Sequence, residues 1–467
     1  MIQIFNQLVS LKALVLIQAE ALVTLSCFLA ASRIWFWNDH TAMEEHAAWP
    51  FFILQCLIQV ALLPVCFYYN GLYNFKSSRT GSQQFAGIAR AIGSLGVISA
   101  ALYFMVPQLM IGRGVTILGL CLTLIGVLAV RLVLDRLWQA AAPTCNVLVV
   151  GTGQLALALT QEVSRREDLK LNISAFAVTD ASRGSLNGHF SGRLLISTSN
   201  LLRDVPTLGV SRVVVATDDP KDLPVAELVT LRQRGVRVDA GHEVLAALTG
   251  KIRLDTIPPG NVIFKNSSEV SKLTLIWKRA LDLLLSVAGS LITAPVLLLI
   301  AIAILIDSGR PILYRQTRVG LYNSQFQLLK FRSMRADAEP DGQARWASVD
   351  DPRTTRVGAF IRSYRLDELP QFINVIRGEM SFVGPRPERP LFVSQLRSQI
   401  PHYDERHLVR PGVTGWAQVQ FPYARTFSDA AQKLEYDLFY LKNMSLFFDC
   451  AIALKTLRIV LLGAQNH

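Results

Sequence analysis

The sequence predicts an α+β membrane protein in three parts, and two observations predict it. First, 51% of the 467 residues are apolar and only 18% are charged, which is unusual for a soluble protein. Second, long apolar runs dominate the first third of the chain, and shorter apolar segments alternate with helical patterns after Pro143. The expected parts are transmembrane helices over 1–140, a Rossmann-like α/β domain over 143–255 and a mainly α-helical domain over 307–467, which follows an apolar segment at 272–306.

The N-terminal part contains four apolar runs, at about 13–36, 50–70, 91–111 and 114–135. Each approaches the ~20 residues that a helix needs to cross a bilayer. The alternative is a set of buried helices in a soluble protein, but four such runs in succession favour membrane spans. The first run lacks the basic start and the cleavage site of a signal peptide, so we expect it to be a span.

The charges between these runs predict an orientation, because cytoplasmic loops are enriched in Lys and Arg. The loop at 37–49 carries three acidic residues and no basic one, whereas the loop at 71–90 carries three basic residues. Arg113 alone opposes the pattern. The N-terminus and everything after about 137 are therefore expected in the cytoplasm. The loop residues concerned are Asp39, Glu44, Glu45, Lys76, Arg79 and Arg90.

The middle domain begins with a short apolar strand, 146–150, followed by Gly151-Thr-Gly153 and a helical pattern. This order is similar to the glycine turn of dinucleotide-binding folds, where a pyrophosphate approaches a helix N-terminus. Further strands are predicted at 173–178, 212–216 and 236–239. Gly151 and Gly153 are thus candidate cofactor-binding residues. The alternative is an empty or regulatory domain, since a lone glycine motif has little specificity.

A fifth apolar run at 283–306 is long enough to span a bilayer, but Pro295 lies in its middle and basic residues flank both ends. Proline removes a helix hydrogen bond and favours a bend. The residues alone leave a span and a hairpin that returns to its side of entry equally open. The last helical pattern, 445–462, is either a helix at the membrane interface or a core-facing helix.

Arginine is strongly favoured over lysine near the C-terminus: Asp307–Pro411 holds sixteen arginines and one lysine, Lys330. Because the arginine fork binds phosphate oxygens in pairs, this bias indicates phosphate recognition, with anionic lipid as the alternative. The net charge of +12 agrees with anionic partners. No nucleic-acid-binding module accompanies these charges, and the cysteines and histidines do not have metal-ligand spacing.

Adjacent carboxylates, Asp367 and Glu368, precede a short helix that Pro370 and Gly378 are expected to bracket. Asp is a common helix cap, so this placement has an ordinary structural explanation. A helix N-terminus also favours the ionised, nucleophilic form of a carboxylate. The second acid would then bind Mg²⁺ or transfer a proton.

Seven blocks between Lys278 and Trp416 resemble, in order, the bacterial sugar transferase family, also called polyprenyl-phosphate hexose-1-phosphate transferases or monotopic phosphoglycosyl transferases. The N-terminal spans and α/β domain resemble its large members. Trp346-Ala and Pro387-Glu388-Arg389 resemble the branch found with exopolysaccharide operons. The blocks are Lys278–Asp282, Gln316–Gly320, Lys330–Met334, Thr355–Gly358, Arg365–Gln371, Gly378–Pro387 and Arg410–Trp416.

The resemblance implies transfer of hexose 1-phosphate from a UDP-hexose to undecaprenyl phosphate, with release of UMP and Mg²⁺ as cofactor. Asp367 would be the nucleophile, forming a phosphosugar-aspartyl intermediate, and Asp367 and Glu368 would hold the metal. The family uses a re-entrant hairpin broken at Ser-Pro; here the pair is Ala294-Pro295. Substrate-binding roles are implied for Arg318, Lys330, Arg332, Arg356, Arg365, Gln371, Arg386, Arg410 and Thr414.

The same resemblance places the protein in the bacterial inner membrane, in contact with lipid and with its catalytic domain on the cytoplasmic face. The hexose stays open, as does the oligomeric state, for which a homodimer through the middle domain is one option. Two alternatives remain: a non-catalytic scaffold or nucleotide sensor that acts through the α/β domain, and a conventional glycosyltransferase that releases UDP. The nucleotide product separates them.

Overall fold

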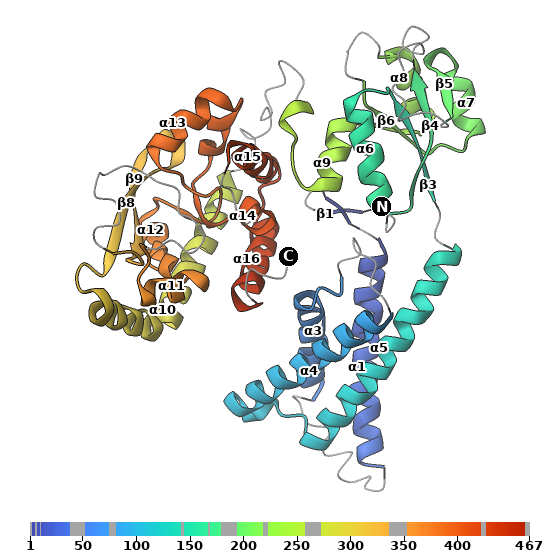
Figure 1. Ribbon diagram of the computed structural model, residues 1–467. Helices are drawn as coiled ribbons and strands as arrows, with labels where there is room; N and C mark the ends of the chain where they lie inside the picture. Colours follow the sequence, from blue (N-terminus) through green and yellow to red (C-terminus); the bar gives the residue numbers. More distant parts are fainter. Residues whose placement is uncertain are drawn as a thin grey trace. The chain divides into compact units, whose positions relative to one another are not determined.

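The chain divides into two compact units, Leu8–Gly241 and His242–His467, in the computed structural model (Figure 1). Two short N-terminal strands, β1 (Ile2–Ile4) and β2 (Gln7–Val9), pair with each other. The structure describes residues 2–4, 7–9, 11–37, 52–73, 81–141, 144–166, 169–178, 194–217, 223–256, 272–335, 353–421 and 426–462.

The first unit begins with four long helices, as the sequence predicts. They are α1 (Leu11–Trp35), α3 (Phe52–Tyr69), α4 (Gly81–Met105) and α5 (Arg113–Ala141). Together with α10 of the second unit, they are the described helices that are long and apolar enough to cross a membrane. The predicted bounds of the third run, 91–111, were wrong: the helix starts at Gly81 and ends before Pro107, whose missing N–H and fixed φ stop it.

The predicted orientation stays a prediction. The loop residues Asp39, Glu44, Glu45, Lys76 and Arg79 lie outside the described residues. Arg90 lies inside α4 rather than in a loop, and its Nε donates to the Ala86 carbonyl, so it weighs less in the charge comparison.

Polar side chains link these helices internally. Glu20 on α1 is fully buried and its Oε1 lies 2.6 Å from the Arg131 guanidinium on α5, while Oε2 accepts a hydrogen bond from the Tyr73 hydroxyl at 2.6 Å. On α4, Ser99 donates to Gln59 of α3 at 2.8 Å. Each buried polar pair therefore fixes which helix faces meet.

The α/β part of the same unit is a five-stranded parallel sheet of order β5-β4-β3-β6-β7, which confirms the predicted Rossmann-like arrangement. The short strand β5 was not predicted, because only three residues form it. Apolar strand centres pack between helices in a core that includes Leu148, Ala177 and Val213. The elements are β3 (Cys145–Val150), α6 (Gln154–Arg165), β4 (Leu171–Val178), β5 (Leu195–Ser197), α7 (Leu201–Thr207), β6 (Arg212–Val215), α8 (Val225–Gln233) and β7 (Arg237–Ala240).

The second unit starts earlier than the predicted boundaries. Helix α9 (Gly241–Thr249) contributes Ala246 to the core of this unit, and Trp416 donates its indole N–H to the Gly250 carbonyl at 2.7 Å. Lys251 forms an ion pair of 2.6 Å with Glu435. Residues 242–256 thus belong to the C-terminal unit.

Helix α10 (Lys272–Ser308) contains the fifth apolar run. It stays helical through Pro295, so the expected break in the helix does not appear, although its ribbon changes direction along its length in Figure 1. The other elements are β8 (Leu313–Val319), β9 (Gln325–Phe331), α11 (Arg356–Ser363), α12 (Gln371–Arg377), β10 (Ser381–Val383), α13 (Pro390–Gln399), β11 (Gly412–Thr414), α14 (Trp416–Gln420), α15 (Phe427–Lys442) and α16 (Leu446–Leu462).

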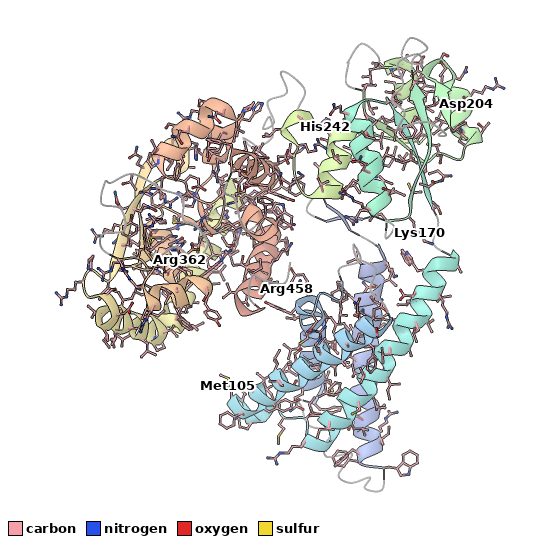
Figure 2. The ribbon with its side chains drawn as sticks, viewed as in Figure 1. Met105, Lys170, Asp204, His242, Arg362 and Arg458 are labelled. Atoms are coloured by element: carbon pink, nitrogen blue, oxygen red, sulfur yellow. The ribbon has the colours of Figure 1, made fainter. Side chains whose placement is uncertain are left out.

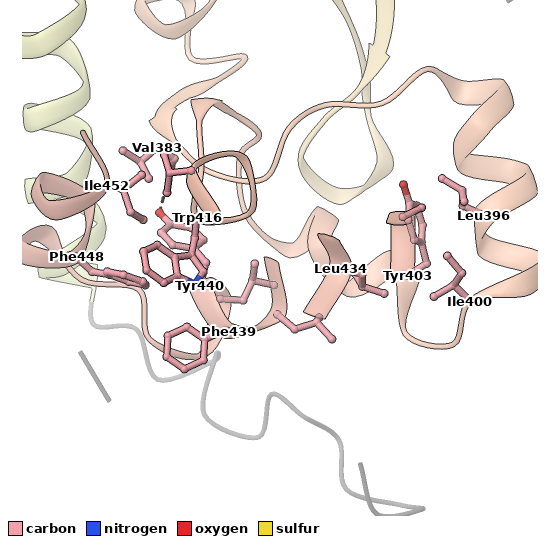
Figure 3. Packing of buried hydrophobic residues seen from close by; sticks show 14 of the residues in the cluster. Val383, Leu396, Ile400, Tyr403, Trp416, Leu434, Phe439, Tyr440, Phe448 and Ile452 are labelled. Atoms are coloured by element: carbon pink, nitrogen blue, oxygen red, sulfur yellow. Dashed lines mark hydrogen bonds between the residues drawn. The ribbon is translucent and has the colours of Figure 1, made fainter. Parts of the chain in front are cut away.

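The core of this unit gathers aromatic and aliphatic side chains from α13 to α16 (Figure 3). On α16, Phe448 and Ile452 are buried in it, whereas Phe447 and Leu454 are exposed. One face of the last helix is therefore core-facing, as one of the two sequence interpretations proposed, and the opposite face presents apolar side chains outward.

Candidate active site

Buried polar contacts hold the N-terminal half of α10 against β10 and α16. Lys278 donates to Asp449 at 2.6 Å and to the Val383 carbonyl at 3.0 Å. Asp282 accepts from the Ser381 hydroxyl and from the Phe382 N–H. The block Lys278–Asp282 therefore contributes by holding this helix against β10 rather than by forming the site.

Asn374 of α12, which is fully buried, links the acidic pair's region to strand β9. Its Oδ1 accepts from the Leu329 N–H at 3.0 Å, and its Nδ2 donates to the Gln327 carbonyl at 2.8 Å. These bonds set the register between α12 and the strand that carries Lys330. Since Asn374 follows the acidic pair by six residues, it also positions that pair against the strand.

The acidic pair lies in a 3₁₀ turn, η10 (Leu366–Glu368), just before α12. Gly378 ends α12 in the left-handed conformation (φ 84°) and Pro370 precedes it, which confirms the predicted brackets. Arg365 enters the turn at φ 54°, a conformation that is uncommon for a residue with a Cβ. This backbone, held by the Glu368 N–H to the Arg365 carbonyl at 3.2 Å, turns both carboxyl groups inward.

Glu368 accepts both nearby cations on one oxygen. Its Oε1 lies 3.1 Å from Lys330 Nζ and 2.7 Å from an Arg386 Nη, and its side chain is 12% exposed. Burial alone would raise the pKa of Glu368, but Arg386 and Lys330 outweigh it and hold this pKa below its usual range. Burial in turn lowers the pKa of Lys330. Glu368 is thus an ionised anchor for two cations.

Asp367 is buried beside this cluster, yet its carboxylate makes no hydrogen bond or ion pair within the described part of the chain. Burial raises the pKa of Asp367, opposed mainly by Lys330. The sequence argument that a helix N-terminus lowers this pKa was wrong, because burial decides the direction of the shift, and Pro370 rather than Asp367 occupies the cap of α12. Of the two acids, Asp367 is therefore the one whose carboxylate is not paired with a described cation.

Asp367 and Glu368 fit Mg²⁺ only if a phosphorylated substrate and water supply the remaining ligands. Among the described residues, no group of three or more His, Cys, Asp or Glu side chains is placed to hold a metal. Mg²⁺ commonly takes one or two carboxylates, with substrate phosphates and water completing its shell. Glu368 also keeps Oε2 without a described partner. A metal held jointly by these carboxylates and a phosphorylated substrate agrees with this donor set.

The two glycine- and proline-rich stretches meet as parallel strands β10 and β11, with Ser381 opposite Gly412 and Val383 opposite Thr414. Their backbones approach so closely that a Cβ on Gly384 or Gly415 would collide with main-chain oxygen atoms. Glycine is therefore required at this crossing. The crossing ends at Pro385, so it fixes where Arg386 starts.

The structure places some predicted substrate residues at the site and others away from it. Arg318, on β8, lies beside the Arg386 turn and donates to the Pro387 carbonyl at 2.9 Å. Gln371 is buried at the start of α12. Arg365 adds its charge to the surroundings of Glu368. These residues join Lys330 and Arg386 around the acidic pair.

The remaining four differ. Arg356 is exposed at the start of α11, and Arg410 is exposed with its Nε on the Gly378 carbonyl. Thr414 shares a hydrogen bond of 2.6 Å with Thr456 on α16. Arg332 donates to the carbonyls of Ser308, Gly309 and Arg310, so it caps the end of α10. We therefore assign Thr414 and Arg332 to packing contacts.

Sequence reasoning missed two arginines. Arg362 on α11, labelled in Figure 2, is close enough to lower the pKa of Asp367. Arg406, in the turn η11 (Tyr403–Leu408), donates to the Arg386 carbonyl at 2.8 Å. The arginine-for-lysine bias was the available signal, but it marked the whole region and singled out neither residue.

The glycine turn of the sheet keeps its predicted form. Gly151 has φ 111°, and a Cβ there would lie 2.5 Å from the Ala216 carbonyl oxygen; Gly153 caps α6 without a side-chain bond. These features are what packing between strand ends requires. Cofactor binding by Gly151 and Gly153 stays a prediction.

Comparison with known proteins identifies the class. Residues 273–463 match the family described as bacterial sugar transferase. The chain is 39% identical over 267 residues to a UDP-N-acetylgalactosamine-undecaprenyl-phosphate N-acetylgalactosaminephosphotransferase of Aeromonas hydrophila, covering 56% of this chain and 62% of the relative. It is 42% identical over 238 residues to an undecaprenyl-phosphate glucose phosphotransferase of Komagataeibacter xylinus, covering 49% and 44%.

A third relative, a UDP-glucose:undecaprenyl-phosphate glucose-1-phosphate transferase of Caulobacter vibrioides, is 41% identical over 181 residues, covering 38% of this chain and 67% of the relative. The chain belongs to the bacterial sugar transferase family, as the ordered blocks predicted. Its matches span about half the length of the first two relatives.

Proposed function

We propose that this protein transfers hexose 1-phosphate from a UDP-hexose to undecaprenyl phosphate and releases UMP. The observation that carries the proposal is the difference between the two acids: Glu368 binds Lys330 and Arg386, whereas Asp367 beside them makes no hydrogen bond or ion pair with the described residues. The family membership and the names of the relatives support this reaction.

In the proposed mechanism, an oxygen of Asp367 attacks the sugar-bearing phosphorus of the UDP-hexose. The new P–O bond forms as the bond to the UMP oxygen breaks, which gives a phosphosugar-aspartyl intermediate and free UMP. A phosphate oxygen of undecaprenyl phosphate then attacks the same phosphorus and releases Asp367. Lys330 and Arg386 lie where they would stabilise the charge on the transferring phosphoryl group.

Asp367 and Glu368 are the residues that would hold Mg²⁺ together with the substrate. When bound, the metal would neutralise negative charge on the pyrophosphate. The chain's own contribution is the fixed position of Glu368, which keeps two cations beside Asp367 and away from direct pairing with it.

We further propose four N-terminal spans and a membrane-embedded α10 that returns to the cytoplasmic face of the inner membrane. The apolar helices and the direction change of α10 support this arrangement. Exposed apolar side chains along α10, including Leu291, Ile292 and Leu298, suit contact with lipid. A hairpin would place the site where a soluble sugar nucleotide and a membrane lipid phosphate meet.

The test is UMP release from a panel of UDP-hexoses with undecaprenyl phosphate and Mg²⁺. Asp367→Asn, which keeps the side-chain shape, should abolish release and the covalent phosphosugar adduct while unfolding stays unchanged. Wild-type turnover in this variant would remove Asp367 as the nucleophile. Nucleotide binding at Gly151 and Gly153 without UMP release would favour the scaffold or sensor alternative, and UDP as product would indicate a conventional glycosyltransferase.

A further inference from the structure

The turn that carries Arg386 is held at three successive carbonyl groups. Arg406 donates to the Arg386 carbonyl at 2.8 Å, and Arg318 donates to the Pro387 carbonyl at 2.9 Å. The backbone N–H of Val319 donates to the Glu388 carbonyl at 3.0 Å. With proline on both sides of Arg386, the main chain here has little freedom left.

Arg406, one of the two side-chain donors, is itself buried and held by further contacts. Its exposed fraction is 6%, and one Nη donates to the Tyr403 hydroxyl at 2.7 Å. The other Nη lies 3.0 Å from Oδ2 of Asp437 on α15, which is 2% exposed. Such a pair is costly to bury, and removing one partner leaves a buried charge uncompensated.

The contacts form a continuous path to the acidic pair. Asp437 holds Arg406, Arg406 holds the main chain of Arg386, and the Arg386 side chain holds Glu368 at 2.7 Å. Neither Arg406 nor Asp437 makes a described contact with Asp367 or Glu368. Their effect on the site would therefore pass through the position of Arg386.

We infer that Arg406 and Asp437 are positioning residues for the phosphosugar transfer, which act by fixing Arg386 against Glu368. The inference rests on the proposed function and adds a buried ion pair outside the acidic centre to the machinery of the reaction. A displaced Arg386 would leave Glu368 with Lys330 alone, and a small misplacement of a charged group is costly when it acts on a transition state.

A double-mutant cycle on kcat/KM for UMP release tests this coupling. Arg406→Met should lower kcat/KM on the order of tenfold to a hundredfold in the wild-type background. In an Arg386→Lys background, where the contact to Glu368 is already altered, the same change should cost much less. A residue that only supports the fold would lower kcat/KM by the same factor in both backgrounds.

Glu435→Gln is the matched control, since Glu435 lies on α15 as Asp437 does but pairs with Lys251 instead of Arg406. Its effect should be additive with Arg386→Lys. If Arg406→Met does not fold, Asp437→Asn carries the cycle, because it keeps the side-chain shape while removing the charge. If the effects of both Arg406→Met and Asp437→Asn on kcat/KM, measured per folded molecule, are additive with that of Arg386→Lys, the inference is overturned and the proposed function stands. Absence of UMP release by the wild type would remove the proposed function and this role with it.

Discussion

Each unit contains a buried cluster in which acidic and basic side chains meet, and the two clusters are built differently. Among the N-terminal helices, Glu20 meets Arg131 and Tyr73, so both of its oxygens are engaged. In the C-terminal unit, Glu368 binds Lys330 and Arg386 through a single oxygen, and its neighbour Asp367 pairs with none of the described residues. In the first cluster the carboxylate is fully engaged, whereas the second contains a carboxylate without a described partner.

The difference separates a structural ion pair from a chemical site. A closed cluster specifies which helices pack together, and its members can be exchanged for apolar residues without loss of chemistry. An open cluster could not be exchanged in this way, because the proposed reaction uses Asp367 and the cations around it. Four substitutions test this distinction.

Glu368→Gln should have the largest effect. Without the Glu368 charge, Asp367 is the next acid that acts on Lys330, so Lys330 would hold the proposed nucleophile in an ion pair. We expect kcat to fall on the order of 10²-fold or more. Turnover is measured per folded molecule, with Glu435→Gln as the control. Wild-type turnover in Glu368→Gln would show that the two cations do not need this anchor.

Arg131→Met should destabilise the protein without impairing its chemistry. Leaving Glu20 buried and uncompensated costs about 3–5 kcal/mol. The midpoint of thermal unfolding in detergent should fall, while kcat per folded molecule stays the same. The double variant Glu20→Leu/Arg131→Met should recover most of the lost stability. Loss of kcat in the double variant would mean that this cluster, too, takes part in the reaction.

Lys330→Met should move the pH dependence of turnover. Asp367 must be ionised to attack, so turnover is lost as the pH falls through its pKa. Burial raises the pKa of Asp367 and Lys330 is the main group that opposes it. Removing Lys330 should raise this pKa further, so the acidic limb of kcat/KM moves to higher pH. Arg397→Met, which removes a cation paired with Asp404, is the control and should leave the limb in place.

Much of the architecture could be predicted from the sequence, because it depends on local patterns. Apolar runs located the long helices, β-rich segments located four of five strands of the parallel sheet, and Pro370 with Gly378 bracketed α12. The exceptions have local causes as well: Pro107 ended α4 early, and β5 is too short to leave a pattern.

The pairing of side chains could not be predicted from the sequence, because it depends on contacts between distant segments. The sequence placed Asp367 and Glu368 together but could not show that Glu368 would take both cations. The excess of arginine also indicated phosphate recognition for the region as a whole and could not separate arginines at the site from structural ones. The helix-end argument for Asp367 failed for the same reason, since burial by the surrounding fold decided the direction of its pKa shift.

Arg332→Lys should have the smallest effect and tests one of those arginines. In the structure, its guanidinium holds three carbonyls at the end of α10, and a lysine would keep fewer of these bonds. We expect a loss of about 1–2 kcal/mol in stability and an unchanged KM for the UDP-hexose. Arg356→Lys is the counterpart: Arg356 is exposed and makes no described contact, so a substrate role would raise KM without changing stability. An increased KM in Arg332→Lys would return Arg332 to the substrate site and extend the open cluster to the end of α10.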